Sequence, residues 1–133
     1  MAYADTRAKI ESLWRAAEAG DAEQVKAILD DGMHDASGGN TWQSDSDPRG
    51  WQRSPLHMAA KEGHGAVVDL LLAEGADVNA RSKYGDTPLH FALGSGSVEV
   101  ITALYQAGAD VTIENDDGDS VAALGEKVGL KFG

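Results

Sequence analysis

One stretch of this sequence repeats itself after 33 residues without a gap. The segment SPLHMAAKEGHGAVVDLLLAEGADVNA, residues 54–80, aligns with TPLHFALGSGSVEVITALYQAGADVTI, residues 87–113. The shared letters include Pro-Leu-His near the start, a glycine after the first apolar run, and Gly-Ala-Asp-Val near the end. Self-similarity at such a period predicts a stack of like units. Because one unit of this size cannot bury its own apolar faces, its neighbours must pack against it.

Each repeated unit has the pattern of a turn followed by two antiparallel helices. Ser54 and Thr87 stand where they can cap a helix. Pro55 and Pro88 follow at the first helical position, where a missing N–H has no cost. Apolar residues then recur at helical spacing through both helices, and glycines follow each helix where a left-handed backbone is favoured. The pattern predicts an all-α chain.

The TPLH, GH and GADVN motifs at this spacing resemble the ankyrin repeat. The resemblance covers about residues 12–129. It implies an ankyrin-repeat solenoid of stacked helix-turn-helix units joined by β-hairpin-like turns, in a single domain over residues 1–133. We expect about three and a half repeats, with units over about residues 5–32, 47–81, 82–114 and 115–133 and an inserted loop over about 33–46.

The first and last units depart from this pattern. Residues 13–32 match residues 56–75 at an offset of 43, so ten extra residues separate the first two units. The first unit lacks TPLH and instead continues a helical apolar stripe upstream, which predicts a capping unit. Residues 115–129 match residues 82–96 without the proline and histidine. In the second unit Gln52 replaces the turn glycine, so we expect the turn there to be distorted or longer than usual.

Composition excludes several classes of function. The chain has 133 residues, no Cys, and 22 Asp and Glu against 11 Lys and Arg, a formal charge of −11. The missing thiols exclude disulfides and thiolate metal sites. The charge disfavours nucleic-acid binding. No apolar run approaches the roughly 20 residues of a membrane span. We expect a cytoplasmic monomer, and the absence of a catalytic motif predicts no enzyme, cofactor or metal.

The histidines have a structural interpretation by resemblance. His57 and His90 belong to the Pro-Leu-His motif and His64 to the Gly-His motif, and in ankyrin-like proteins these residues bond neighbouring turns. Asn79 of the DVNA turn is interpreted as a hydrogen-bonding turn residue. His34, beside acidic residues of the inserted loop, is an alternative cation ligand, although the spacing fixes no geometry.

Candidate binding residues also follow from the resemblance, because ankyrin-like proteins usually bind ligands through their turn tips and the exposed end of the first helix. Carried across by position, these residues are Trp51, Arg53, Lys61, Lys83, Tyr84, Asp86, Asp116, Asp117 and Asp119, to which we add Trp42 of the inserted loop. Trp51 and Tyr84 fall on equivalent positions and, with the nearby cations, predict an aromatic–cationic ridge. The alternative is that Trp51 packs onto Trp42 and faces no partner.

Charge along the chain favours a basic partner. From Asp86 to Glu126 there are eight acidic residues and no Lys or Arg. This anionic segment would steer a positively charged protein toward the last units. The sequence therefore predicts a protein–protein interaction module that binds a basic protein or peptide through its turn tips and concave helix face. The alternative is a small-ligand binder or enzyme that uses residues 33–53 as a lid over the groove.

Overall fold

The computed structural model describes residues 3–30, 51–127 and 129. The helices are α1 (Tyr3–Ala19), α2 (Ala22–Asp30), α3 (Pro55–Lys61), α4 (Gly65–Ala73), α5 (Pro88–Ser95), α6 (Val98–Gln106) and α7 (Val121–Lys127). Within the described ranges the only β pairing is one isolated antiparallel bridge, between Glu114 and Ser120. The expected all-α architecture is therefore confirmed.

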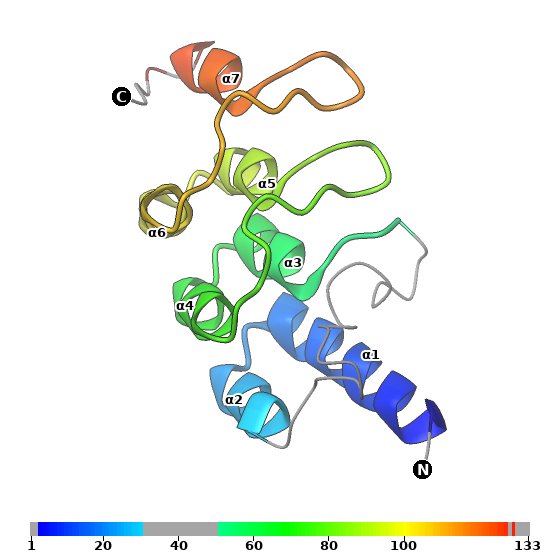
Figure 1. The fold of residues 1–133 in the computed structure, drawn as a ribbon. Helices are drawn as coiled ribbons and strands as arrows, with labels where there is room; N and C mark the ends of the chain where they lie inside the picture. The colour runs from blue at the N-terminus through cyan, green and yellow to red at the C-terminus, as the bar shows by residue number, and fades with distance from the viewer. Residues whose placement is uncertain (1–2, 31–50, 128, 130–133) are drawn as a thin grey trace.

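The helices form two columns, with the turns projecting on one side (Figure 1). Helices α1, α3, α5 and α7 pack in sequence along the inner column, and α2, α4 and α6 pack along the outer one. Each unit contributes one helix to each column, except the last, for which the described residues include α7 alone. The expected stack of helical hairpins is confirmed. The inserted loop expected over residues 33–46 lies outside the described part of the chain.

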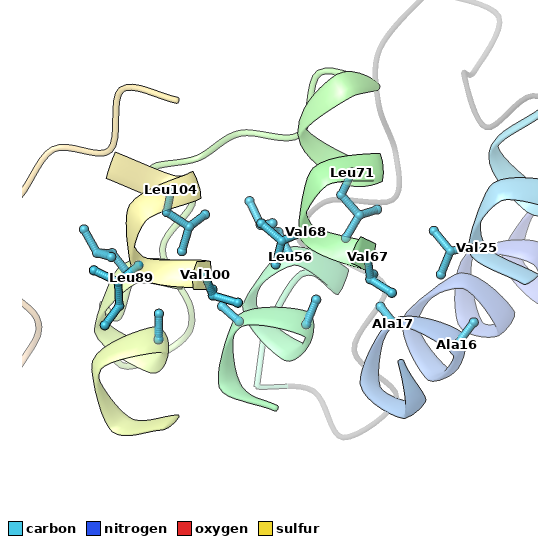
Figure 2. Close-up of a cluster of buried hydrophobic side chains, with 14 of the residues drawn as sticks. Ala16, Ala17, Val25, Leu56, Val67, Val68, Leu71, Leu89, Val100 and Leu104 are labelled. Atoms are coloured by element: carbon cyan, nitrogen blue, oxygen red, sulfur yellow. The ribbon is translucent and has the colours of Figure 1, made fainter. Parts of the chain in front are cut away.

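The core runs continuously between the two columns (Figure 2). Leucines from both columns, Leu56 and Leu89 inside and Leu71 and Leu104 outside, are completely buried. Alanines supply much of the buried inner-helix surface, and their small side chains allow neighbouring helices to approach closely. Burying a leucine contributes about 1.5–3 kcal/mol relative to leaving it exposed, and no single unit could bury its leucines alone.

The caps predicted for the inner helices are present. Ser54 and Thr87 have extended backbones, and each side-chain oxygen accepts the backbone N–H of the histidine three residues on, His57 or His90. A second, reciprocal hydrogen bond is also present, in which Nδ1 of each histidine accepts the backbone N–H of the cap residue at 3.0 Å. These reciprocal bonds fix the rotation of the imidazole rings.

The same imidazole rings join successive units. Nε2 of His57 donates to the carbonyl of Asp86 at 2.9 Å, and Nε2 of His90 donates to that of Asp119 at 2.9 Å. In the opposite direction, the His64 ring bonds the carbonyl of Glu18 at 3.0 Å. The expectation that these histidines tie unit to unit is therefore confirmed.

The first unit makes the same link with a different residue. Trp14 occupies the place of His57 in the offset alignment, and its indole N–H donates to the carbonyl of Arg53 at 2.7 Å. Arg53 precedes Asp86 by one period of 33 residues, so the acceptor atom is equivalent. A buried indole therefore replaces the missing histidine and keeps the first turn in register with the later ones.

Among the helices of the described residues, none combines the length and the apolar character that a membrane span requires.

Candidate functional site

The turns between units form a row held in register by backbone hydrogen bonds. The N–H of Lys83 donates to the carbonyl of Trp51 at 2.9 Å, and one period later the N–H of Asp116 donates to the carbonyl of Tyr84 at 2.9 Å. We call the residues of these turns, 51–53, 82–86 and 115–119, the turn row. It projects from the inner column on the side away from α4 and α6 (Figure 1).

The turn that contains Gln52 keeps this register, so the expected distortion is wrong for its described part. Gln52 has φ of 57°, close to the 82° and 81° of its glycine equivalents, Gly85 and Gly118. An L-residue in this left-handed region is strained by about 1–2 kcal/mol. The hydrogen bond of the next turn to the Trp51 carbonyl is nevertheless made. The stack thus imposes a glycine conformation on a glutamine.

Trp51 and Tyr84 come together on the turn row as the equivalent positions predicted. Their ring centroids lie 6.4 Å apart at an interplanar angle of 76°, an edge-to-face pair. The two side chains remain 46% and 53% exposed. Such pairs contribute about 0.5–1.5 kcal/mol beyond the area that they bury. The arrangement fixes two large aromatic surfaces beside each other while leaving half of each in water.

Arg53 differs from its expected role as an exposed contact, because only 4% of it is exposed. Its guanidinium carbon lies 4.8 Å from the centroid of the Trp51 ring and 5.4 Å from that of Trp14. These two indoles withdraw the cation from solvent, and each contact contributes about 0.5–2 kcal/mol. Arg53 therefore supports Trp51 from beneath. Lys83 does stay exposed, with Nζ 5.9 Å from the Tyr84 ring centroid.

The acidic end of the turn row is organised by Asn115. Its side-chain oxygen accepts the backbone N–H groups of Asp117 and Asp119, each at 3.0 Å, and its amide donates to a carboxylate oxygen of Asp86 at 2.8 Å. Asp116 and Asp117 point their charges into solvent, whereas Asp86 and Asp119 are half-buried. In the part of the chain that the structure describes, no three acidic or histidine side chains gather in a way that could hold a metal ion.

The remaining candidates do not join this group. Lys61 is exposed in the last turn of α3, at the end of the helix remote from the turn row. Trp42 lies outside the described residues, and so do His34 and its acidic neighbours. Asn79 has the expected structural role, because its side-chain oxygen accepts the N–H of Asp110 in the next unit at 2.7 Å.

His57 is the buried titratable group behind the turn row. Burial lowers its pKa to about 4, and the hydrogen bond to the Asp86 carbonyl offsets only part of this effect. The imidazole is therefore neutral at physiological pH. A neutral ring that is buried and bonded on both nitrogens is a structural element, not an acid or base for chemistry.

Comparison with known proteins identifies the class. Residues 13–115 match the family model described as ankyrin repeats in three copies, so this chain belongs to the ankyrin-repeat family. Ankyrin repeats generally mediate protein–protein interaction and are typically non-catalytic.

Several curated proteins are similar over part of the chain. E3 ubiquitin-protein ligase XBAT33 of Arabidopsis thaliana is 40% identical over 77 residues, 58% of this chain and 14% of the relative. The 2-5A-dependent ribonuclease of Mus musculus is 37% identical over 76 residues, 57% of this chain and 9% of the relative. Integrin-linked protein kinase homolog pat-4 of Caenorhabditis elegans is 40% identical over 68 residues, 51% of this chain and 13% of the relative. The match thus spans only a small part of each relative.

Sequence reasoning missed the partnership of Trp14 with Arg53. The available signal was the alignment at an offset of 43, which places Trp14 on His57. If the indole replaces the histidine, the Arg53 carbonyl becomes its acceptor, which brings the backbone of Arg53 next to the tryptophan.

Proposed function

We propose that this chain binds a basic protein or peptide through its turn row. The observation that carries the proposal is the edge-to-face pair of Trp51 and Tyr84, half exposed and held in register on successive turns. Tryptophan and tyrosine are enriched among the residues that dominate binding energy at protein interfaces. The pair is the only place in the described residues where two large exposed aromatic rings touch each other.

Preorganisation supports the proposal. The backbone of Trp51 is bonded to the next turn, its ring lies against the Arg53 guanidinium, and it forms an edge-to-face pair with Tyr84. Ordering a long side chain on binding costs about 0.5–1.5 kcal/mol. Much of that cost is already met when these rings are fixed by folding. A partner would therefore gain most of the burial energy of both rings.

Charge determines the kind of partner that we propose. Asp116 and Asp117 extend the turn row with exposed carboxylates, and the segment from Asp86 to Glu126 contains no Lys or Arg. Arg81 of the preceding turn, which donates to the Glu114 carbonyl, is a cation close to Asp116, so the excess of acidic charge is greatest at Asp117. A basic surface would meet complementary potential there, with an association rate that falls as salt is added. In this proposal Asp86 and Asp119 contribute charge to the same acidic flank. Lys61, on the inner column, is a peripheral contact for a partner that reaches beyond the turns.

We further propose that the module acts as a monomer. Light scattering over a concentration series tests this point, and a mass that doubles with concentration would refute it.

The proposed binding surface is tested with a double variant and a matched control. Trp51→Ala with Tyr84→Ala removes both rings, while Val98→Ala removes a 68% exposed apolar residue from the outer helix α6. Proteins captured from the native source are identified, purified and titrated calorimetrically against all three forms. We expect the double variant to bind about tenfold or more weakly and the control to bind normally. Equal affinity for the wild type and the double variant would refute the proposed surface.

A further inference from the structure

Building on the proposed function, we infer which kind of segment the aromatic pair receives. It is an extended, proline-rich segment in the polyproline II conformation, with a basic residue at the end that lies over Asp116 and Asp117. The inference rests on the hydrogen-bonding capacity, spacing and charge of residues in the turn row.

The aromatic pair offers two hydrogen-bond donors that the described part of the fold does not use. The indole N–H of Trp51 and the hydroxyl of Tyr84 bond to no other side chain or backbone group among the described residues. A polyproline II segment has no internal hydrogen bonds, so its carbonyls need donors from outside. A helix would offer no such carbonyls, because its own backbone uses them. Two aromatic rings with outward donors are therefore matched to a segment with free carbonyls.

The distance between the two rings also fits a polyproline II segment. The two ring centroids lie 6.4 Å apart. A polyproline II segment rises about 3.1 Å per residue, so two residues advance about 6.2 Å. With three residues per turn, residues i and i+2 also lie about 120° apart around the segment axis, so they can meet two rings that stand at 76° to each other. Proline rings are apolar and flat enough to pack on aromatic surfaces, and their fixed backbone loses little entropy on binding.

The charges along the turn row determine where a basic residue of the segment would lie. Each ring already has a cation of this chain close by, Arg53 beside Trp51 and Lys83 beside Tyr84. A basic side chain of the partner would be repelled from those rings. The next position in the same register is Asp117, one period after Tyr84, with Asp116 adjacent. Apolar residues of the segment thus belong on the rings, and its basic residue belongs one unit further on.

A peptide-display selection tests the inference. Random displayed peptides are selected on the wild-type protein, and clones that also bind the double variant Trp51→Ala, Tyr84→Ala are discarded. We expect the remaining clones to share a proline-rich core with Arg or Lys at one end. Clones that depend on the two rings but lack proline would overturn this inference and leave the proposed function standing. If no clone depends on the rings, both fall.

Synthetic peptides based on the selected motif then separate the two halves of the contact. Replacing the prolines with glycine should weaken binding about tenfold or more, because the unbound peptide becomes flexible. Reversing Asp116 and Asp117 to lysine should weaken the basic peptide but not a neutral one of the same proline content. The matched control is Asp69→Lys, an exposed reversal on the outer helix α4, which should leave both peptides unaffected. Equal loss for the neutral and the basic peptide would refute the placement of the charges.

Discussion

Acidification should destabilise this fold through His57 well before most carboxylates are protonated. Nδ1 of the ring accepts the N–H of Ser54 at 3.0 Å and lies 2.8 Å from the hydroxyl of the same residue. Nε2 therefore carries the proton and donates to the Asp86 carbonyl. A second proton could bind only at Nδ1, where it would face an N–H donor inside the core.

The magnitude follows from the difference in pKa between the two states. In the unfolded chain the histidine pKa is 6.5, and burial in the fold lowers it to about 4. Above pH 6.5 the ring is neutral in both states and contributes no pH dependence. Between pH 6.5 and 4 the unfolded chain binds a proton that the folded chain does not. The free energy of unfolding then falls by about 1.4 kcal/mol per pH unit, or about 3 kcal/mol in total.

Urea denaturation at several pH values between 7 and 4 measures this loss, with His57→Asn as the comparison. Asparagine keeps an acceptor near Ser54 but does not titrate, so its free energy of unfolding should fall less steeply as the pH decreases. Taking the difference between the two proteins removes the contribution of the carboxylates. Parallel slopes would refute the reasoning.

Nitrogen NMR of the imidazole provides a measurement that does not depend on the variant. The His57 ring should remain neutral at pH 5, with its proton on Nε2. A doubly protonated ring at that pH in the folded protein would contradict the assigned hydrogen bonds.

Further predictions concern stability and are all checked by chemical denaturation. Gln52→Gly should raise the free energy of unfolding by about 0.5–1 kcal/mol, because glycine adopts the observed φ of 57° without strain; no gain would contradict that strain. Trp14→Phe should lower it by about 1–3 kcal/mol, since the buried carbonyl that the indole binds loses its donor, and unchanged stability would refute the link. Gly20→Ala should lower it by at least about 1 kcal/mol, because φ is +77° and the new Cβ would lie 2.6 Å from the His64 ring. The matched change Gly94→Ala, with open space around its Cβ inside α5, should raise it by about 1 kcal/mol, and a loss there would contradict the exposed helical environment.

The repeated part of the fold was predictable because its signals are local. A cap residue, a proline and a histidine at fixed offsets specify the start of an inner helix, and Ser54 and Thr87 behave as that pattern requires. The pairing of Trp51 with Tyr84 followed in the same way, since equivalent positions in a periodic stack must be neighbours.

The burial of the Arg53 side chain could not be predicted from the sequence of its own unit. Its burial depends on Trp14, which belongs to a different unit, and the alignment that places Trp14 on His57 does not specify where the guanidinium lies. Gln52 shows a second limit. Propensity favours a glycine at its φ, but the bond between neighbouring turns holds the glutamine there, so the stack overrides the local preference.

The histidine bonds that join successive units have a consequence for engineering. In both histidine links the donor precedes its acceptor by 29 residues, fewer than the 33 of one period. A cassette of 33 residues beginning at Ser54 therefore carries both halves of the link, and a further copy would bring its own histidine and its own acceptor carbonyl. The molecule could thus be lengthened along a linear ligand in whole units, each of which carries its own histidine link.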